Sequence, residues 1–250
     1  MGESECTLSS GCEQLHVYQH AQQFLDYREK VLGNIHPLVA ACDHLLRASE
    51  SIPLNIAHGA AARSPKERGA HYGYACGSAL ECAACLDVLA TKRVIEGDIQ
   101  TGGKKILREI VSMLVAMQKI AANRLREEPA QYGAPDQKVY FDHERLQAYK
   151  SALTFIAWMT EETLNPSCSA DLRTKLDRAS TSVVLNIAEG NGRFSNADKI
   201  KFFHTAERAN AQLTALLDIA FRKAGNVDQG RAILTTTGRL LTGLIKSKAP

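Results

Sequence analysis

The sequence predicts an all-α protein built from two tandem antiparallel four-helix bundles. Apolar residues recur at helical spacing in almost every segment, and no stretch shows the sustained alternation that is typical of a strand. One segment of the chain is repeated 131 residues further on. The chain has 250 residues, of which 45% are hydrophobic, so each half is long enough to bury a core of its own.

The repeat is clearest in a short segment of each half. Residues 51–59 read SIPLNIAHG and residues 182–190 read SVVLNIAEG, with six identities. The register continues beyond this segment, because Ser64 aligns with Ser195. A fixed period of this length indicates a duplicated structural unit. We therefore expect the two halves to fold alike.

Helical periodicity predicts four helices in each half. They cover residues 15–47, 50–62, 66–95 and 103–126 in the first half, and 141–164, 170–190, 197–224 and 228–246 in the second. The third helix of each half carries an apolar stripe of the kind that packs in a bundle. The two stripes are Tyr72, Ala75, Ala79, Cys82, Leu86 and Leu89, and Phe203, Ala206, Asn210, Leu213, Leu217 and Ala220.

The third helices also have clear start signals. Ser64, followed by proline and by Glu67, is typical of a capping box, and Ser195 with Asp198 is its counterpart. Each serine is expected to accept a hydrogen bond from a backbone N–H group in the first turn.

Glycines and prolines indicate the remaining boundaries. Gly59 and Gly190 are predicted to close the second helices in a left-handed conformation. A segment with two prolines and a glycine separates the halves. The predicted organisation is a disordered N-terminus at 1–13, the first bundle at 14–127, a linker at 128–140 and the second bundle at 141–250.

Composition is that of an ordinary globular protein with uneven charge. The formal net charge is +3, with −1 in residues 1–135 and +4 in residues 136–250. The acidic N-terminus is unlike a signal peptide, and no uninterrupted apolar run approaches the length of a membrane span, so we expect a cytoplasmic protein without a membrane partner. The seven cysteines are an odd number and are expected to be reduced thiols.

Two motifs carry a family resemblance. The second half has Asn186-Ile-Ala-Glu-Gly190 followed by Gly192-Arg-Phe-Ser195, and the first half has Ala75-Cys-Gly-Ser-Ala-Leu-Glu81. Together they resemble the four-helix-bundle family of the 23S rRNA intervening-sequence proteins, which includes the accessory protein of diversity-generating retroelements. Each half retains the motif that the other has lost: the second half has residues 208–212, Arg-Ala-Asn-Ala-Gln, in place of the Gly-Ser-x-x-Glu segment, and the first half has His58 for the glutamate and Ala61-Ala62 for Gly-Arg.

The resemblance implies basic, ring-forming bundles, typically pentamers, without catalytic residues. It also implies RNA or DNA as a ligand and a reverse transcriptase as a possible protein partner. A chain of two repeats cannot be divided evenly into a ring of five. Three arrangements therefore remain open: one repeat joins a ring, the ring has an even number of bundles, or the chain is a pseudo-symmetric monomer.

Basic residues are the candidates for nucleic-acid binding, because phosphate contacts dominate such interfaces. The second half supplies the predicted contacts, Arg193, Lys199, Lys201, Arg208, Arg222 and Lys223, with further basic residues at Arg231, Arg239, Lys246 and Lys248. The first half has a basic group on its fourth helix, including Lys104, Lys105 and Arg108. Ordinary solvated helix faces are the alternative explanation for both groups.

Four polar residues are predicted to have structural roles: Asn55, Asn186, Glu81 and Glu189. The two asparagines occupy the same position in both halves, and a buried asparagine needs hydrogen bonds. Direct ligand contact by the asparagines is the alternative, and a pocket around them would favour an enzyme.

The sequence predicts no catalytic residue, metal site or cofactor. Cys82-Ala-Ala-Cys85 has the spacing of half a zinc site, but leucines occupy the equivalent positions in the second half. Glu13 and His16 form one Glu-x-x-His arm, and a di-iron site needs two.

We therefore expect a non-enzymatic protein that binds nucleic acid, or serves a reverse transcriptase, through the basic surface of its second half. A protein-interaction or oligomeric scaffold without nucleic-acid affinity is the alternative, because the net charge is small.

Overall fold

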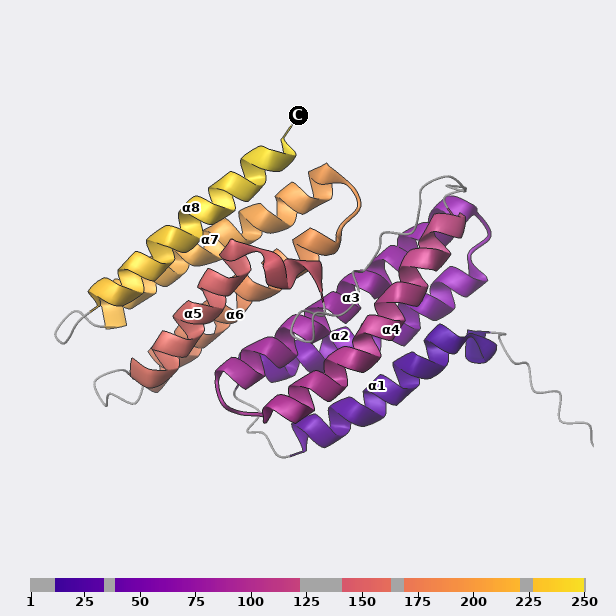
Figure 1. Ribbon diagram of the computed structural model, residues 1–250, viewed down its shortest axis with the longest axis horizontal. Coiled ribbons are helices and arrows are strands. Elements are labelled where there is room, and N and C mark those ends of the chain that lie inside the picture. The colour runs from indigo at the N-terminus through magenta and orange to yellow at the C-terminus, as the bar shows by residue number, and fades with distance from the viewer. Residues whose placement is uncertain (1–11, 34–38, 122–140, 163–168, 221–226, 250) are drawn as a thin grey trace, which may run out of the picture.

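The computed structural model describes residues 12–33, 39–121, 141–162, 169–220 and 227–249. In these ranges every regular element is a helix, and the helices form two bundles that lie side by side (Figure 1). The predicted all-α fold of two tandem bundles is confirmed. The predicted linker and residues 1–11 lie outside the described residues.

Each bundle contains a short 3₁₀ helix and four α-helices. Bundle 1 comprises η1 (Cys12–Gln14), α1 (His16–Leu32), α2 (Ala40–Ala61), α3 (Pro65–Thr91) and α4 (Gly97–Ala121). Bundle 2 comprises η2 (Asp142–Arg145), α5 (Gln147–Glu162), α6 (Ala170–Gly192), α7 (Asn196–Ala220) and α8 (Asp228–Lys248).

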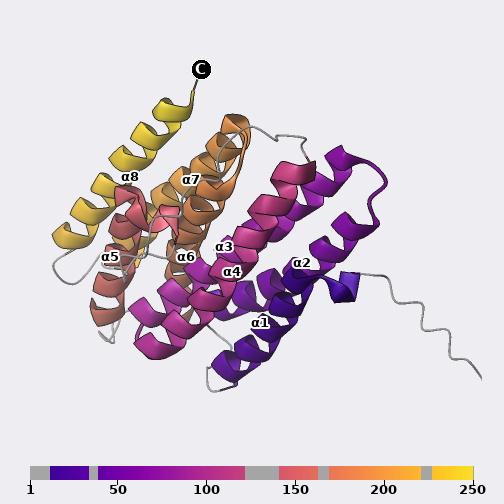
Figure 2. The same ribbon diagram turned by 45° about the vertical axis from the view of Figure 1, so that its right-hand side comes forward.

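The two bundles have the same internal order. In bundle 1, α1 and α3 each contact both α2 and α4, and in bundle 2, α5 and α7 each contact both α6 and α8. Consecutive helices are therefore neighbours, as short connections in an up-and-down bundle require. Between the bundles, α3 lies against α6, and α8 and α1 lie at opposite ends of the molecule (Figure 2).

The first predicted helix, 15–47, is wrong at its C-terminal end. In the structure α1 ends at Leu32 and α2 begins at Ala40. The sequence explains the break, because Gly33 follows α1 directly and Pro37 disfavours a continuous helix.

The predicted start signals of α3 and α7 are confirmed. Ser64 Oγ accepts a hydrogen bond from the backbone N–H of Glu67 at 3.1 Å. Ser195 Oγ accepts one from the backbone N–H of Asp198 at 3.0 Å. Each serine therefore satisfies one of the backbone donors that an α-helix leaves without a partner in its first turn.

The predicted left-handed closure at Gly59 and Gly190 is wrong, since both glycines lie inside helices and neither has a positive φ. They are needed instead for close packing. A Cβ atom at Gly59 would lie 2.7 Å from Cδ1 of Tyr72, and one at Gly190 would lie 2.9 Å from Cε1 of Phe203. Tyr72 and Phe203 are equivalent in the repeat, so both bundles make the same glycine–aromatic contact.

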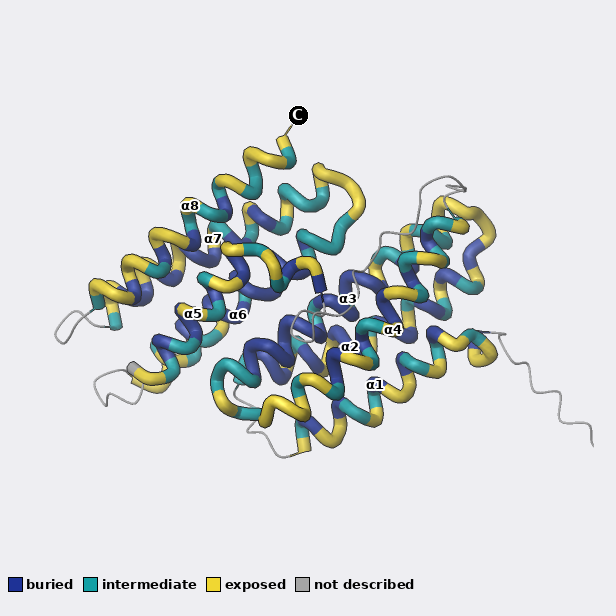
Figure 3. The backbone as a smooth tube through the Cα atoms, viewed as in Figure 1, coloured by how far each residue is buried: buried dark blue, intermediate teal, exposed yellow. Residues whose placement is uncertain are grey.

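Helix α3 is the most deeply buried helix of the fold (Figure 3). All members of its predicted apolar stripe are buried, and those of α7 are buried except Ala220. The opposite side of α3 is also covered, because Ala83, Ala84 and Val88 are 0% exposed. Helix α3 is long and apolar enough to cross a membrane by length and composition, but 72% of the relevant window is buried inside the fold. A position between two bundles accounts for this composition.

Candidate functional site

A buried polar cluster joins the two bundles around Asp87 of α3. The Lys104 ammonium of α4 lies 2.6 Å from Oδ1 of Asp87 and 2.8 Å from Oε1 of Glu144 in η2. Gln100 donates to the same Asp87 oxygen at 2.6 Å, and the Tyr149 hydroxyl of α5 donates to Oδ2 at 2.7 Å. Asp87 thus binds partners from both bundles.

The burial of this cluster controls its ionisation. Burial alone would lower the pKa of Lys104, but the carboxylates of Asp87 and Glu144 outweigh that effect and raise it. Burial raises the pKa of Tyr149 well above its usual value, and the Asp87 charge raises it further. Lys104 is therefore charged and Tyr149 neutral, which suits an ammonium and a hydroxyl that both donate to Asp87.

His143 lies beside this cluster as a neutral ring. Burial lowers its pKa to about 3, and the Lys104 charge adds to this effect while Asp87 opposes it. The ring is stacked on Phe141, with centroids 5.6 Å apart, and makes an edge contact with Tyr149. Among the described residues, no hydrogen-bond partner reaches its Nε2 atom.

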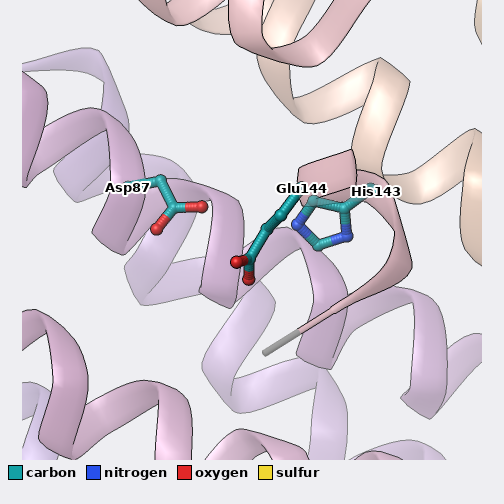
Figure 4. Close-up of side chains that lie close together, drawn as sticks. All are labelled: Asp87, His143 and Glu144. Carbon is teal, nitrogen blue, oxygen red and sulfur yellow. The ribbon is translucent and has the colours of Figure 1, made fainter. Parts of the chain in front are cut away.

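Three residues of the cluster could in principle ligate a metal ion, namely Asp87, His143 and Glu144 (Figure 4). One ligand atom of each lies within 4.8 Å of the others. The ammonium of Lys104, however, bridges the two carboxylates and already supplies the compensating positive charge. The donor set therefore fits an ion-paired joint between bundles better than a metal centre.

A second polar group joins the bundles at the end of α6. Arg193 pairs with Glu189, and its guanidinium lies 4.7 Å from the ring centroid of Phe202 and 6.0 Å from that of Tyr74 on α3. Burial raises the pKa of Glu189, although Arg193 opposes the shift. A Cβ atom at Gly77 of α3 would lie 3.3 Å from Nη2 of Arg193. Helix α3 therefore has a glycine where Arg193, the residue that follows α6, packs against it.

Glu81 lies near this second group. Its carboxylate is 3.0 Å from Nδ1 of His44, and its negative charge contributes to the raised pKa of Glu189. Two of the residues predicted to be structural, Glu81 and Glu189, thus come from different bundles and lie close together.

The two predicted asparagines make the same local contact. Asn55 donates to the backbone oxygen of Ser51 at 2.9 Å and to its hydroxyl at 3.0 Å. Asn186 donates to the equivalent atoms of Ser182 at 2.7 and 3.2 Å. In bundle 1 the contact extends to α3, because Ser78 donates to the Ser51 hydroxyl at 2.9 Å. The asparagine contacts are thus local to α2 and α6, and in bundle 1 Ser78 connects the contact to α3.

The residues predicted to bind nucleic acid do not form one group. Arg193 is committed to the joint between the bundles. Lys201 is exposed and lies 3.1 Å from the Asp198 carboxylate, and Arg208 is exposed on α7. Arg222 and Lys223 lie outside the described residues.

A basic region nevertheless exists at one end of bundle 2. Helices α7 and α8 are antiparallel, so Lys199 in the first turn of α7 lies near Lys248 at the end of α8. Burial lowers the pKa of Lys199, and the Lys248 charge lowers it further, although Asp142 opposes this. Lys246 is exposed in the same last turn of α8. We call Lys199, Lys246 and Lys248 the basic end of bundle 2.

The comparisons with known proteins give one match. A family model described as 23S rRNA-intervening sequence protein matches residues 13–116 and 144–237. The chain belongs to the 23S rRNA-intervening sequence protein family. The two matched segments begin 131 residues apart, which is the period of the repeat. No curated protein and no solved structure matches the chain significantly.

Within this family fold, the two retained motifs face each other across the joint. The motif of the second half supplies Glu189 and Arg193, and the motif of the first half supplies Gly77, which Arg193 packs against, and Glu81. This explains why each half retains what the other has lost: only one copy of each motif lies between the bundles.

Sequence reasoning placed Lys104 in an exposed basic group, and this is wrong, because its side chain is 6% exposed and ion-paired. It also missed the cluster around Asp87. The available signal was the repeat itself, in which Asp87 corresponds to Asp218 and Tyr149 to Tyr18. An aspartate and a tyrosine shared by both halves marked these positions, although in bundle 2 the aspartate pairs with Arg231.

Proposed function

We propose that this protein is a non-enzymatic RNA-binding protein of the cytoplasm that uses the basic end of bundle 2. The convergence of Lys199 and Lys248 is the observation that carries the proposal. The two like charges lie close enough for Lys248 to lower the pKa of Lys199 although Asp142 opposes the shift, and a phosphate group would relieve this repulsion. The description of the family, which refers to 23S rRNA, supports RNA as the ligand.

Two further exposed cations lie on α7. Lys201 and Arg208 are two helical turns apart and share one face of the helix, with Lys201 near the basic end and Arg208 near the middle of α7. The pairing of Lys201 with Asp198 is solvent-exposed and therefore weak, so a phosphate can compete for the lysine.

A reverse transcriptase is the proposed protein partner, and self-association is the proposed assembly, both on the strength of the family resemblance. A scaffold without RNA affinity is the second candidate function. Exposed apolar side chains on the helix faces support it, with Leu54 60% and Ile219 62% exposed.

Fluorescence anisotropy with a structured RNA and a duplex DNA, each titrated at low and near-physiological salt, tests RNA binding. The wild-type chain should bind the RNA, and its affinity should fall steeply with salt. The K199E-K248E variant should bind at least about tenfold more weakly. Its log–log salt slope should shrink by roughly 0.7 to 0.9 for each lysine that contacts a phosphate.

The matched control is K105E-R108E, which makes the same charge change on α4 of bundle 1. Lys105 and Arg108 line a groove between α1 and α4 with His20 and Glu109, far along the chain from the basic end. This variant should bind RNA as the wild type does. Absence of binding at low salt would contradict the proposal, and so would an equal loss in both variants.

A further inference from the structure

The two bundles dock in a head-to-tail arrangement. Helix α3 of bundle 1 contacts α6 and α5 of bundle 2. In a two-fold arrangement the equivalent contacts, α7 with α2 and α7 with α1, would also form, and the described residues make neither. The joint is therefore heterologous. Each bundle uses a different main helix, α3 in bundle 1 and α6 in bundle 2, and α2 also contacts α6. Helix α7, the equivalent of α3, is turned outward, and so is part of α2, the equivalent of α6.

We name the outward faces after their main helices. The α2 face of bundle 1 is equivalent to the α6 side of the joint and comprises Tyr18, Leu46, Leu54, His58 and Ala61, with the buried Ala62 at its edge. The α7 face of bundle 2 is equivalent to the α3 side and comprises Arg208, Ala211, Thr214, Ala215, Asp218 and Ile219.

Both outward faces expose apolar side chains at positions that are buried in the joint. Leu54 is 60% exposed, whereas its counterpart Leu185 on α6 is 3% exposed. Ile219 is 62% exposed, whereas its counterpart Val88 on α3 is 0% exposed. Leu46, at 40%, is a third exposed apolar residue on the α2 face. Large exposed apolar side chains clustered in this way mark interaction surfaces.

At one position of the two outward faces, the facing side chains also complement each other in size. In the joint, Arg193, the residue that follows α6, packs against a glycine, Gly77, of α3. On the outward faces the large residue is on the other side, with Arg208 on the α7 face and Ala62 on the α2 face. One turn away, no such exchange occurs. A Cβ atom at Gly192 would collide with Leu80, whereas the equivalent outward residues, Ala61 and Ala211, are both small.

One hydrogen-bonding pair of the joint is preserved on the outward faces. Tyr149 donates to Asp87 across the joint at 2.7 Å. Their counterparts are Tyr18 on the α2 face and Asp218 on the α7 face. Asp218 is exposed and bonded to Arg231, so one of its carboxylate oxygens can accept from an incoming hydroxyl.

We propose that the α7 face binds the α2 face of a second copy of this chain, in the arrangement of the internal joint. The outward contact lacks much of the ion pairing of the joint: Lys92 pairs with Asp177 inside the chain, and Leu46 occupies the equivalent of Asp177 on the α2 face. Assembly is therefore weaker than the joint and reversible on dilution. It specifies the self-association proposed above and does not depend on RNA binding.

Sedimentation of the full chain without RNA, from micromolar to near-millimolar concentration, tests this assembly. The mass of the wild type should rise from 27.3 kDa to at least twice that value. L54E and I219E should each remain at the mass of one chain, because each places a charge in one of the two faces. I120E is the matched control, since Ile120 on α4 is 73% exposed and lies on neither face, and it should assemble as the wild type does.

Mixing the two variants tests the head-to-tail geometry. L54E retains an intact α7 face and I219E retains an intact α2 face, so an equimolar mixture should form a complex of two chains and no larger species. L54A and I219A, which add no charge, should weaken assembly at least about threefold. They test the same faces should a glutamate variant misfold. A wild type at one-chain mass throughout, a mixture that stays monomeric or an equal loss in I120E would overturn the proposal.

Discussion

Helices α3 and α7 occupy equivalent positions in their bundles but have different surroundings. On α3, Ala83 and Ala84 are 0% exposed, while their counterparts Thr214 and Ala215 on α7 are exposed. The difference arises because α6 covers α3, whereas the described residues of bundle 1 do not contact α7. One ancestral helix has thus become an internal joint in one half and an open surface in the other.

The same comparison shows how burial changes the role of a side chain. Asp87 is 4% exposed and binds three partners from two bundles. Its counterpart Asp218 makes an exposed ion pair with Arg231. The two aspartates should therefore contribute different amounts to the free energy of unfolding. Substitutions at equivalent positions of the two helices should measure this difference.

The largest expected loss of stability follows from removing the buried carboxylate of Asp87. Asp87→Ala leaves Lys104 and the Tyr149 hydroxyl buried without this partner, so the free energy of unfolding should fall by about 3 kcal/mol or more. Asp218→Ala removes a pair in which both side chains are 50% exposed, and should cost less than about 1 kcal/mol. Urea denaturation of the two variants measures both values, and equal losses would contradict the comparison.

A smaller loss of stability is expected when Arg208 of α7 is copied onto α3, where the equivalent residue is Gly77. Gly77→Arg introduces a large cation where Arg193 packs, so overpacking should destabilise the protein by about 1–3 kcal/mol, with charge repulsion added. Arg208→Gly, the reverse change on the exposed face, should cost no more than about 1 kcal/mol, the usual cost of glycine within a helix. Thermal unfolding distinguishes them, and a stable Gly77→Arg protein would show that the joint is not closed at this point.

The smallest effect is a pH dependence that arises in bundle 2. His143 has a folded pKa of about 3, below the unfolded value of about 6.5, so the unfolded chain binds more protons between these pH values. Stability from this group is complete above about pH 6.5 and should fall by about 1.4 kcal/mol per pH unit below it.

His143→Phe is the matching variant, because it keeps an aromatic ring beside Phe141 and does not titrate. The difference in unfolding free energy between wild type and variant should change by about 1.0 kcal/mol from pH 6.5 to 5.5, because the unfolded histidine is already half protonated at pH 6.5. The equivalent position in bundle 1 is Cys12, which is also buried. A constant difference would show that His143 is exposed to solvent.

Much of the fold follows from the sequence, because helical periodicity and the repeat report on contacts within each bundle. The repeat also contained the correct boundary of α2: the predicted helix starting at residue 170 corresponds to residue 39, and α2 begins at Ala40. Periodicity alone missed it, since apolar residues continue at helical spacing on both sides of Gly33.

Helical periodicity did not predict the joint, for a physical reason. Helical spacing indicates that a residue faces inward, but it does not distinguish the core of a bundle from a second buried face. Lys104 illustrates the difficulty, because a lysine beside other basic residues predicts a solvated face. Its burial is compensated by Asp87 of its own bundle and by Glu144, which approaches from the other half.

Hydroxyl-radical footprinting tests the closed joint and the open faces most directly. At a concentration where the chain is monomeric, Leu54 and Ile219 should be oxidised quickly, while their counterparts Leu185 and Val88 should be protected. Oxidation of Leu185 and Val88 at the rates of Leu54 and Ile219 would contradict the account, because it would show that the two bundles do not dock.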